Sequence, residues 1–251
     1  MTARDLGPRA AAGASLLLLP AILAQGWFVR RRVPLLPEAA GPREGVVPGA
    51  EPALRLLVLG ESTAAGIGAA DHGEALGGQV AHALSLETGR AVRWRVLGKG
   101  GATAESTRRD LLLPAPDVAA DVAVIALGVN DTLQFHGYGR WMRGLRALVE
   151  GIRGRCGPVP VVLAAVPPMG RFPALPQPLR GVLGLRASML DAAAATLAAE
   201  VPGLAHVPMP LDPAAPVGQF FCADGFHPGP HGYAVWGATL ARHAAGLLRD
   251  A

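Results

Sequence analysis

The chain has 251 residues, of which 51% are hydrophobic and 17% are charged, and its formal net charge is +4. A chain of this length buries one substantial core, and its composition excludes a coiled coil or a disordered polymer. The scattered basic residues and the low aromatic content of 5% argue against a nucleic-acid-binding protein.

The first 32 residues form an apolar segment that we interpret as membrane-associated or signal-like. Residues 10–29 contain no charged side chain, and about 20 apolar residues are enough to span a bilayer. A cleaved signal peptide, a membrane anchor and an apolar helix packed on the domain are the three alternatives. Arg30, Arg31 and Arg32 follow directly and resist translocation, which favours membrane association over a simple signal peptide. We therefore expect a membrane or cell-envelope location rather than a freely soluble cytoplasmic one.

The next segment, residues 33–52, contains five prolines and no sustained periodicity. This composition predicts an extended linker that leads into a catalytic domain over residues 53–251.

Within the predicted domain, apolar runs of strand length alternate with helical patterns. Strands are predicted at 54–59, 92–97, 121–127, 159–166 and 205–207, and helices at 79–87, 104–112, 141–152, 186–200 and 233–248. This alternation predicts a three-layer α/β/α fold with a flavodoxin-like open parallel sheet of about five strands. In such sheets ligands bind outside the carboxyl ends of the strands, so the residues that directly follow strands are the candidates for chemistry.

Two candidate segments follow the first two predicted strands. Gly-Glu-Ser-Thr at 60–63 places Ser62 at an expected strand-to-helix turn, where its hydroxyl is exposed and a helix N-terminus can stabilise negative charge. Gly-Gly-Ala-Thr at 100–103 follows the second strand, and glycine lets a backbone N–H come close to a ligand.

Two further segments complete the pattern. Gly-Val-Asn-Asp at 128–131 follows the third strand and offers the amide of Asn130 as a neutral donor for an oxyanion. Near the C-terminus, Asp224 precedes His227 by three residues, so its carboxylate can orient the imidazole and stabilise its protonated form. Each segment alone is typical of a turn or a helix cap, but the four together, in this order, are specific.

From about Leu54 to the C-terminus the chain resembles the SGNH (GDSL-type) hydrolases, whose name gives the Ser, Gly, Asn and His of these four segments. The resemblance implies a catalytic triad of Ser62, Asp224 and His227, and an oxyanion hole of Ser62, Gly101 and Asn130. Gly101 is preferred to Gly100 because Gly-x-Thr fits the second segment better. Glu61 departs from the Asp of the usual Gly-Asp-Ser.

The apolar, proline-rich stretch 167–186 follows the fourth strand, and loops of this length are usually functional or disordered. We hypothesise that it forms a wall of the substrate pocket; the alternative is that it covers a sheet edge. The tentative pocket residues are Phe135, Trp141, Phe172 and Leu175. We expect no metal and no organic cofactor, and the pairing of Cys156 with Cys222 in a disulfide stays open.

The predicted function is hydrolysis of carboxylic esters, with short-to-medium acyl chains or lipid-like structure, through an acyl-enzyme on Ser62. The expected partner is therefore a small-molecule ester; the oligomeric state stays open. An acyltransferase or deacetylase that acts on a sugar or lipid hydroxyl would use the same triad and is the first alternative. A non-catalytic envelope protein that binds lipid or glycan on the same fold is the second.

Overall fold

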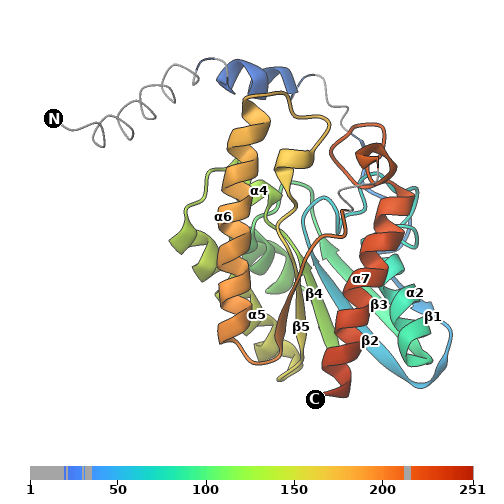
Figure 1. Cartoon of the computed structure of the whole chain (residues 1–251). Coiled ribbons are helices and arrows are strands. Elements are labelled where there is room, and N and C mark those ends of the chain that lie inside the picture. Colours follow the sequence, from blue (N-terminus) through green and yellow to red (C-terminus); the bar gives the residue numbers. More distant parts are fainter. Residues whose placement is uncertain (1–19, 21, 30, 32–35, 212–215, 251) are drawn as a thin grey trace.

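A six-stranded sheet in the order β1-β3-β2-β4-β5-β6 forms the centre of the computed structural model, which describes residues 20, 22–29, 31, 36–211 and 216–250 (Figure 1). Its strands are β1 (Glu44–Val47), β2 (Ala50–Gly60), β3 (Arg90–Gly98), β4 (Val122–Ala126), β5 (Val161–Ala164) and β6 (Leu204–Val207). Strands β2 to β6 pair in parallel, whereas β1 pairs antiparallel with β3. The predicted parallel sheet is confirmed, with one antiparallel edge strand added.

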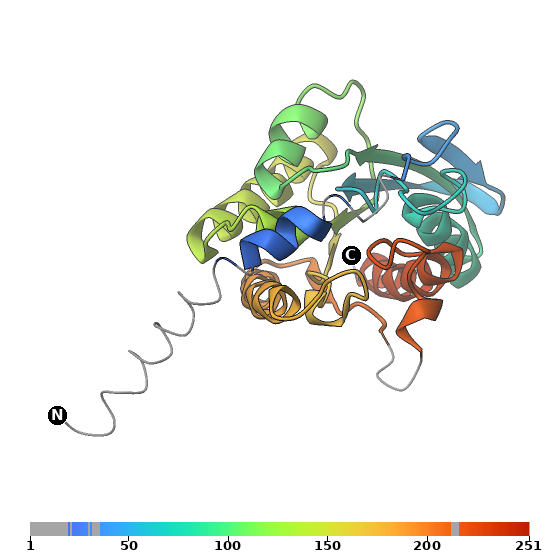
Figure 2. The ribbon, with the colours of Figure 1, turned by 90° about the horizontal axis from the view of Figure 1, so that it is seen from above.

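Helices cover both faces of this sheet (Figure 2). On one side α2 (Leu76–Thr88) packs against α7 (Pro230–Arg249), and on the other α5 (Tyr138–Cys156) packs against α6 (Leu179–Glu200). Short elements complete the layers: α3 (Ala104–Ser106), η1 (Thr107–Leu112), α4 (Val129–Leu133), η2 (Met169–Arg171) and η3 (Val217–Gln219). Every residue of β4 is buried, as a central parallel strand covered on both faces requires. The three-layer prediction is therefore correct.

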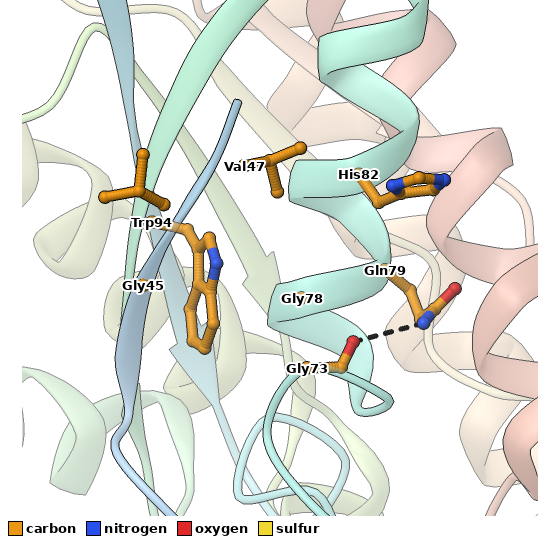
Figure 3. A pocket seen from close by; sticks show the side chains of 8 residues that line it. Gly45, Val47, Gly73, Gly78, Gln79, His82 and Trp94 are labelled. Atoms are coloured by element: carbon orange, nitrogen blue, oxygen red, sulfur yellow. Dashed lines mark hydrogen bonds between the residues drawn. The ribbon is translucent and has the colours of Figure 1, made fainter. Parts of the chain in front are cut away.

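The segment predicted as a linker instead contributes strand β1 and the first residues of β2. Gly45 of β1 lies against the indole of Trp94 on β3, where an added Cβ would come within 2.7 Å of the ring (Figure 3). A residue with a Cβ would have to displace the indole, so glycine at position 45 favours this close approach of β1 to β3. The linker prediction for residues 33–52 is thus wrong over residues 44–52, because a four-residue strand is too short to show a periodicity.

Residues 22–29 form a helix that packs on the domain. Gln25 anchors it to the start of α6: its Nε2 donates to the carbonyl of Gln177 at 2.6 Å, and its Oε1 accepts from the N–H of Leu179 at 3.0 Å. Ile22 and Val29, on the same face of the helix, pack against the hydrophobic core. Residues 1–19 of the predicted apolar segment lie outside the described residues.

Among the described residues, α6 alone is long and apolar enough to cross a membrane by length and composition. In the fold it is a layer of the domain, with contacts to α5, η2 and β6. Its buried apolar residues, among them Leu183, Leu190 and Leu197, therefore have an ordinary role in packing.

Candidate active site

The candidate residues meet at the carboxyl edge of the sheet. Ser62 follows β2, Gly101 follows β3 and Asn130 lies in α4 directly after β4, while His227 precedes α7. Because β2, β3 and β4 are parallel neighbours, their carboxyl ends bring the first three residues together.

The helix expected directly behind Ser62 is absent. Hydrogen-bonded turns follow the serine instead, including one from the N–H of Ile67 to the carbonyl of Ser62 at 3.0 Å, and α2 begins only at Leu76. The prediction of a helix N-terminus at this position is wrong. Stabilisation of negative charge must therefore come from individual donors around the serine.

A continuous chain of hydrogen bonds joins the three triad candidates. His227 Nε2 lies 3.0 Å from Ser62 Oγ, and His227 Nδ1 lies 2.7 Å from Asp224 Oδ2. The side chain of Asp224 is fully buried, whereas that of His227 is 15% exposed. The imidazole is thus held between a shielded carboxylate and a hydroxyl, with one edge open to a ligand.

The carboxylate of Asp224 is held in its charged form by its neighbours. Burial alone would raise its pKa, but hydrogen bonds from the side chain and N–H of His227, from the thiol of Cys222 and from the N–H of Phe226 hold that pKa well below its usual range. Asp224 therefore stays ionised at neutral pH.

Two backbone contacts fix the loop that carries His227. The N–H of Cys222 donates to the carbonyl of His227 at 2.8 Å, and the hydroxyl of buried Tyr233 on α7 donates to the carbonyl of Ile67 at 2.6 Å. The second contact ties α7 to the turns behind Ser62. The spacing between nucleophile and base is therefore set by packing between two separate segments.

Backbone donors suited to an oxyanion lie beside Ser62. The N–H of Gly100 donates to a carboxylate oxygen of Glu38 at 3.0 Å, so it is not available to a ligand. The N–H groups of Gly101 and Ser62 have no acceptor among the described residues. Gly101 also has a φ of +82°, which glycine adopts without strain. These contacts favour Gly101 over Gly100 as the donor.

Glu61 positions the third donor, a role that the sequence did not reveal. Its buried carboxyl accepts hydrogen bonds from the N–H of Val129 at 2.9 Å, from the N–H of Asn130 at 2.9 Å and from Asn130 Nδ2 at 2.5 Å. A primary amide has two N–H bonds, so one Nδ2–H is left for a ligand. Burial raises the pKa of Glu61 to about 8, and the three donors only partly offset this.

We expect Glu61→Gln to lower kcat for ester hydrolysis by about 10- to 100-fold with little change in KM, because a misplaced oxyanion donor acts mainly in the transition state. Asn130→Ala, which removes that donor, should cost about 10²- to 10³-fold. Steady-state kinetics of both variants measures this order. An unchanged kcat in Glu61→Gln would show that Asn130 is positioned without Glu61.

The wild type and Glu61→Gln also test the raised pKa of Glu61, through the pH dependence of their folding stability. The pKa of Glu61 in the folded state lies above the unfolded value of about 4.3. The contribution of its protonated form to folding stability is therefore complete below about pH 4.3 and is lost as the pH rises towards about 8. We expect the thermal midpoint of the wild type to fall from pH 5 to pH 8 relative to that of Glu61→Gln. Parallel midpoints would contradict a raised pKa.

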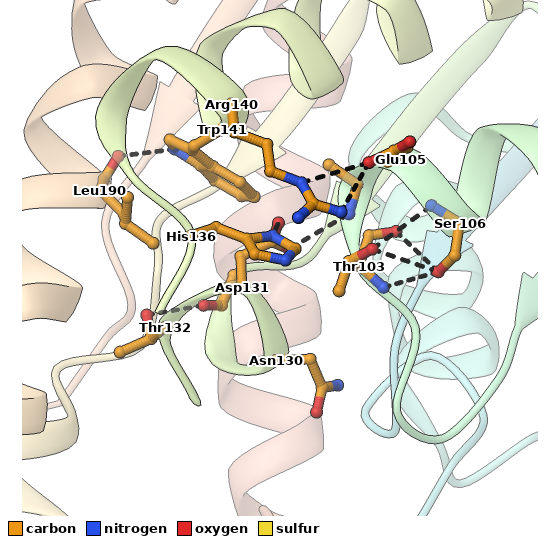
Figure 4. A network of polar contacts seen from close by, with 12 residues as sticks. Thr103, Glu105, Ser106, Asn130, Asp131, Thr132, His136, Arg140, Trp141 and Leu190 are labelled. Carbon is orange, nitrogen blue, oxygen red and sulfur yellow. Dashed lines mark hydrogen bonds and ion pairs between the residues drawn. The ribbon is translucent and has the colours of Figure 1, made fainter. Parts of the chain in front are cut away.

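A buried acid–histidine pair links the segments that carry Gly101 and Asn130 (Figure 4). Asp131 Oδ2 accepts from the N–H of Ala104 at 3.1 Å, and Oδ1 lies 2.8 Å from His136 Nδ1. Asp131 thereby connects α4 to α3. The sequence indicates only a turn role for Asp131 and no role for His136, because the contact to Ala104 joins residues far apart in the chain.

The four tentative pocket residues differ in their exposure. Trp141 is 1% exposed and its indole N–H donates to the carbonyl of Leu190 at 2.8 Å, so it is a core residue that joins α5 to α6. Phe135 is 58% exposed, with the guanidinium of Arg186 4.5 Å from its ring centre. Trp141 therefore occupies a core position, whereas the role of Phe135 in a substrate pocket stays a prediction.

Phe172 and Leu175 are also buried, but Phe172 belongs to an aromatic cluster that reaches the triad. Its ring packs edge-on at 5.1 Å against Phe226, whose ring centre lies 5.1 Å from that of His227. Of the proline-rich stretch 167–186, the part around Phe172 thus supports the histidine through an intervening ring.

Neither a metal centre nor a disulfide is formed by the described residues. They contain no group of three or more His, Cys, Asp or Glu side chains that could hold a metal ion, and Cys156 and Cys222 are free thiols. Burial, together with the hydrogen bond to Asp224, raises the pKa of Cys222 to about 11. The thiol is therefore protonated at neutral pH and acts as a donor to the triad carboxylate.

An open parallel sheet with a Ser–His–Asp hydrogen-bond chain outside its carboxyl edge defines an α/β protein of the serine-hydrolase type. The sequence model of the GDSL-like lipase/acylhydrolase family matches residues 58–235. The chain belongs to this family.

Individual relatives agree with this assignment. Over 191 residues the chain is 34% identical to the GDSL-like esterase Rv1075c of Mycobacterium tuberculosis; the match covers 72% of this chain and 59% of that protein. Among solved structures, a goat-rumen metagenome lipase, Lip_vut3, has a TM-score of 0.59 at 19% identity and is covered to 97%, with 77% of this chain matched. A lipase/acylhydrolase from Enterococcus faecalis has a TM-score of 0.57 at 24% identity, with coverages of 77% and 96%. These structures show the fold.

Proposed function

We propose that the protein hydrolyses carboxylic esters through an acyl-enzyme on Ser62. The observation that carries this proposal is the hydrogen-bond chain from Asp224 through His227 to Ser62 Oγ. A protein that only bound lipid or glycan would not need a nucleophile, a base and a buried carboxylate joined in one hydrogen-bond chain. The curated relative named as an esterase supports the same reaction, although the chain spans only 59% of its length.

In the proposed reaction Ser62 Oγ attacks the ester carbonyl while His227 Nε2 takes the hydroxyl proton. His227 Nδ1 keeps its own proton, which it donates to Asp224 in a hydrogen bond, and the resulting imidazolium is stabilised by that carboxylate. The tetrahedral oxyanion accepts hydrogen bonds from the N–H groups of Ser62 and Gly101 and from Asn130 Nδ2. His227 then protonates the leaving alcohol, and water releases the acyl group by the same steps in reverse.

Labelling with a fluorophosphonate, followed by peptide mass spectrometry, tests this function directly. We expect stoichiometric modification at Ser62, in parallel with hydrolysis of nitrophenyl esters of increasing acyl length. Modification at another residue, or none in a folded protein, would refute the serine mechanism. Addition of an acceptor alcohol to the same assay measures how the acyl-enzyme partitions between water and the alcohol, which separates a hydrolase from a transferase.

We also propose that the helix at residues 22–29 contacts a membrane. Its domain-facing side carries Gln25, whereas Leu23 and Trp27, one turn apart on the other side, are 66% and 59% exposed. Exposed apolar side chains on one helix face suit the interfacial region of a bilayer. The guanidinium of Arg31 lies 4.1 Å from the Trp27 ring, where it adds a positive charge beside this face.

We expect the double variant Leu23→Ser and Trp27→Ser to lose at least about tenfold in vesicle affinity, because full burial of each large apolar side chain contributes about 1.5–3 kcal/mol and about 1.4 kcal/mol corresponds to tenfold. Co-sedimentation with phosphatidylcholine vesicles measures this. Leu185→Ser and Met189→Ser, on exposed positions of α6, form the matched control. Equal losses in both double variants would contradict a specific role of the helix.

A further inference from the structure

A cavity of about 480 Å³, separate from the triad, lies between α5 and the segment formed by α3 and η1. Four arginines line it, Arg108, Arg109, Arg140 and Arg143, and Glu105 is the single carboxylate among the lining residues. The remaining wall is made by Gly144 and Ala147 of α5, which carry no bulky side chain and leave the space open.

Two of these arginines already have counter-ions. Arg109 binds Asp110 through two hydrogen bonds of 2.6 and 2.8 Å. Arg140 binds Glu105 at 2.9 and 3.2 Å, a pair that lies beside the Thr103–Ser106 cap in Figure 4. These pairs fix the positions of two guanidinium groups at the rim of the cavity.

The other two arginines have no such partner. Neither Arg108 nor Arg143 makes a side-chain hydrogen bond or ion pair with a described residue, although like charges surround them. Arg108 Nε is buried without an acceptor, so this side chain is held against α5 by packing and not by a counter-ion. Its terminal nitrogens can therefore donate hydrogen bonds to a ligand in the cavity.

The backbone of η1, which forms one side of the cavity, supports a functional role for its arginines. Arg108 and Arg109 lie in η1, which is a π-helix, and such turns are rare and frequently occur at functional sites. The segment η1 packs closely on α5 at Gly151, where an added Cβ would lie 3.1 Å from Leu112 and 3.6 Å from Arg108 Nε. Both arginines of this irregular turn thus line the cavity.

We propose that this cavity binds a phosphate group. Two unpaired guanidinium groups match the charge of a phosphate monoester or of inorganic phosphate better than that of a single carboxylate. The planar fork of arginine donates to phosphate oxygens in a bidentate manner, which favours this anion further. The site is separate from the triad and does not depend on the proposed ester hydrolysis.

Isothermal titration of the full chain with inorganic phosphate, against chloride at equal ionic strength, tests the proposal. We expect saturable binding in the wild type and a loss of about 10- to 100-fold in Arg143→Gln, because one charge-assisted contact is removed. Arg143 is exposed, so the substitution should not disturb folding. Arg242→Gln is the matched control: Arg242 is an exposed arginine of α7 outside the cavity, and phosphate affinity should stay within about twofold of the wild type.

Vesicle arms distinguish a free phosphate from a lipid headgroup. Co-sedimentation with phosphatidylcholine vesicles is compared with and without phosphatidic acid, whose headgroup is a phosphate monoester. Binding that requires phosphatidic acid and is lost in Arg143→Gln but not in Arg242→Gln identifies the lipid source. Saturable inorganic phosphate binding with the same sensitivity identifies the free anion. The absence of both responses, or equal losses in the two variants, would overturn the proposal.

Discussion

Ser62→Ala should lower kcat for nitrophenyl ester hydrolysis by about 10⁶-fold, and His227→Ala should lower it by a similar factor. The reason lies in the 3.0 Å contact between Ser62 Oγ and His227 Nε2. Without the hydroxyl no acyl-enzyme forms, and without the imidazole the hydroxyl proton has no acceptor. Because the two groups act as one unit, the double variant should be about as slow as either single variant.

The control for this prediction is Ser188→Ala. Ser188 is an exposed residue of α6 whose hydroxyl donates only to the carbonyl of Gly184 at 3.0 Å, so its loss should leave kcat unchanged. A kcat about 10⁶-fold below that of the wild type in Ser62→Ala, with the wild-type thermal midpoint, would support the nucleophile. A Ser62→Ala protein that kept a tenth of the wild-type kcat would require a different nucleophile.

The alternating strands and helices of the fold are predictable from the sequence. Buried parallel strands are continuous apolar runs, so the run at 121–127 is enough to identify the central strand β4. The alternation with helical patterns then determines the layers. Edge strand β1 is not predictable, because its four residues are too few to show a period and its pairing with β3 joins segments far apart in the chain.

The residues of the candidate site likewise fall into those that the sequence reveals and those that it does not. The candidates Ser62, Gly101, Asn130 and His227 stand out in the sequence because each closely follows a strand or forms a compact motif with a neighbour. Glu61 and Asp131 cannot be assigned roles, since their partners lie 68–69 and 27 residues away in the chain. Contacts of this range depend on the strand order, which composition and periodicity do not determine.

The role of Trp141 could not be decided from the sequence for a related reason. Trp141 has a helical spacing that fits both a core position and a cavity wall, and only its hydrogen bond to Leu190 distinguishes them. The residue that does reach the triad, Phe226, lies between Asp224 and His227 in the sequence. Its place in that motif is visible in the sequence, but its packing on Phe172 is not.

Asp224→Asn should lower kcat by about 10⁴-fold while the loop keeps its shape. Oδ1 of Asp224 accepts hydrogen bonds from Cys222, Phe226 N–H and His227 N–H, and an amide oxygen can replace it in all three. The amide nitrogen must then face His227 Nδ1, which becomes an acceptor. The ring proton moves to Nε2, so the imidazole can no longer take the proton of Ser62.

Comparison of Asp224→Asn with Asp224→Ala separates the effect of the imidazole tautomer from the effect of a disturbed loop. Asp224→Ala removes both oxygens and should also loosen the loop, whereas Asp224→Asn should keep the wild-type thermal midpoint within a few degrees. Asp117→Asn, at an exposed position with a φ of 45° that asparagine tolerates, controls for the change from acid to amide. Steady-state kinetics with nitrogen NMR of the imidazole reads both rate and tautomer. If Asp224→Asn retained the Nδ1-protonated ring and most of its activity, the carboxylate would have no essential part in the reaction.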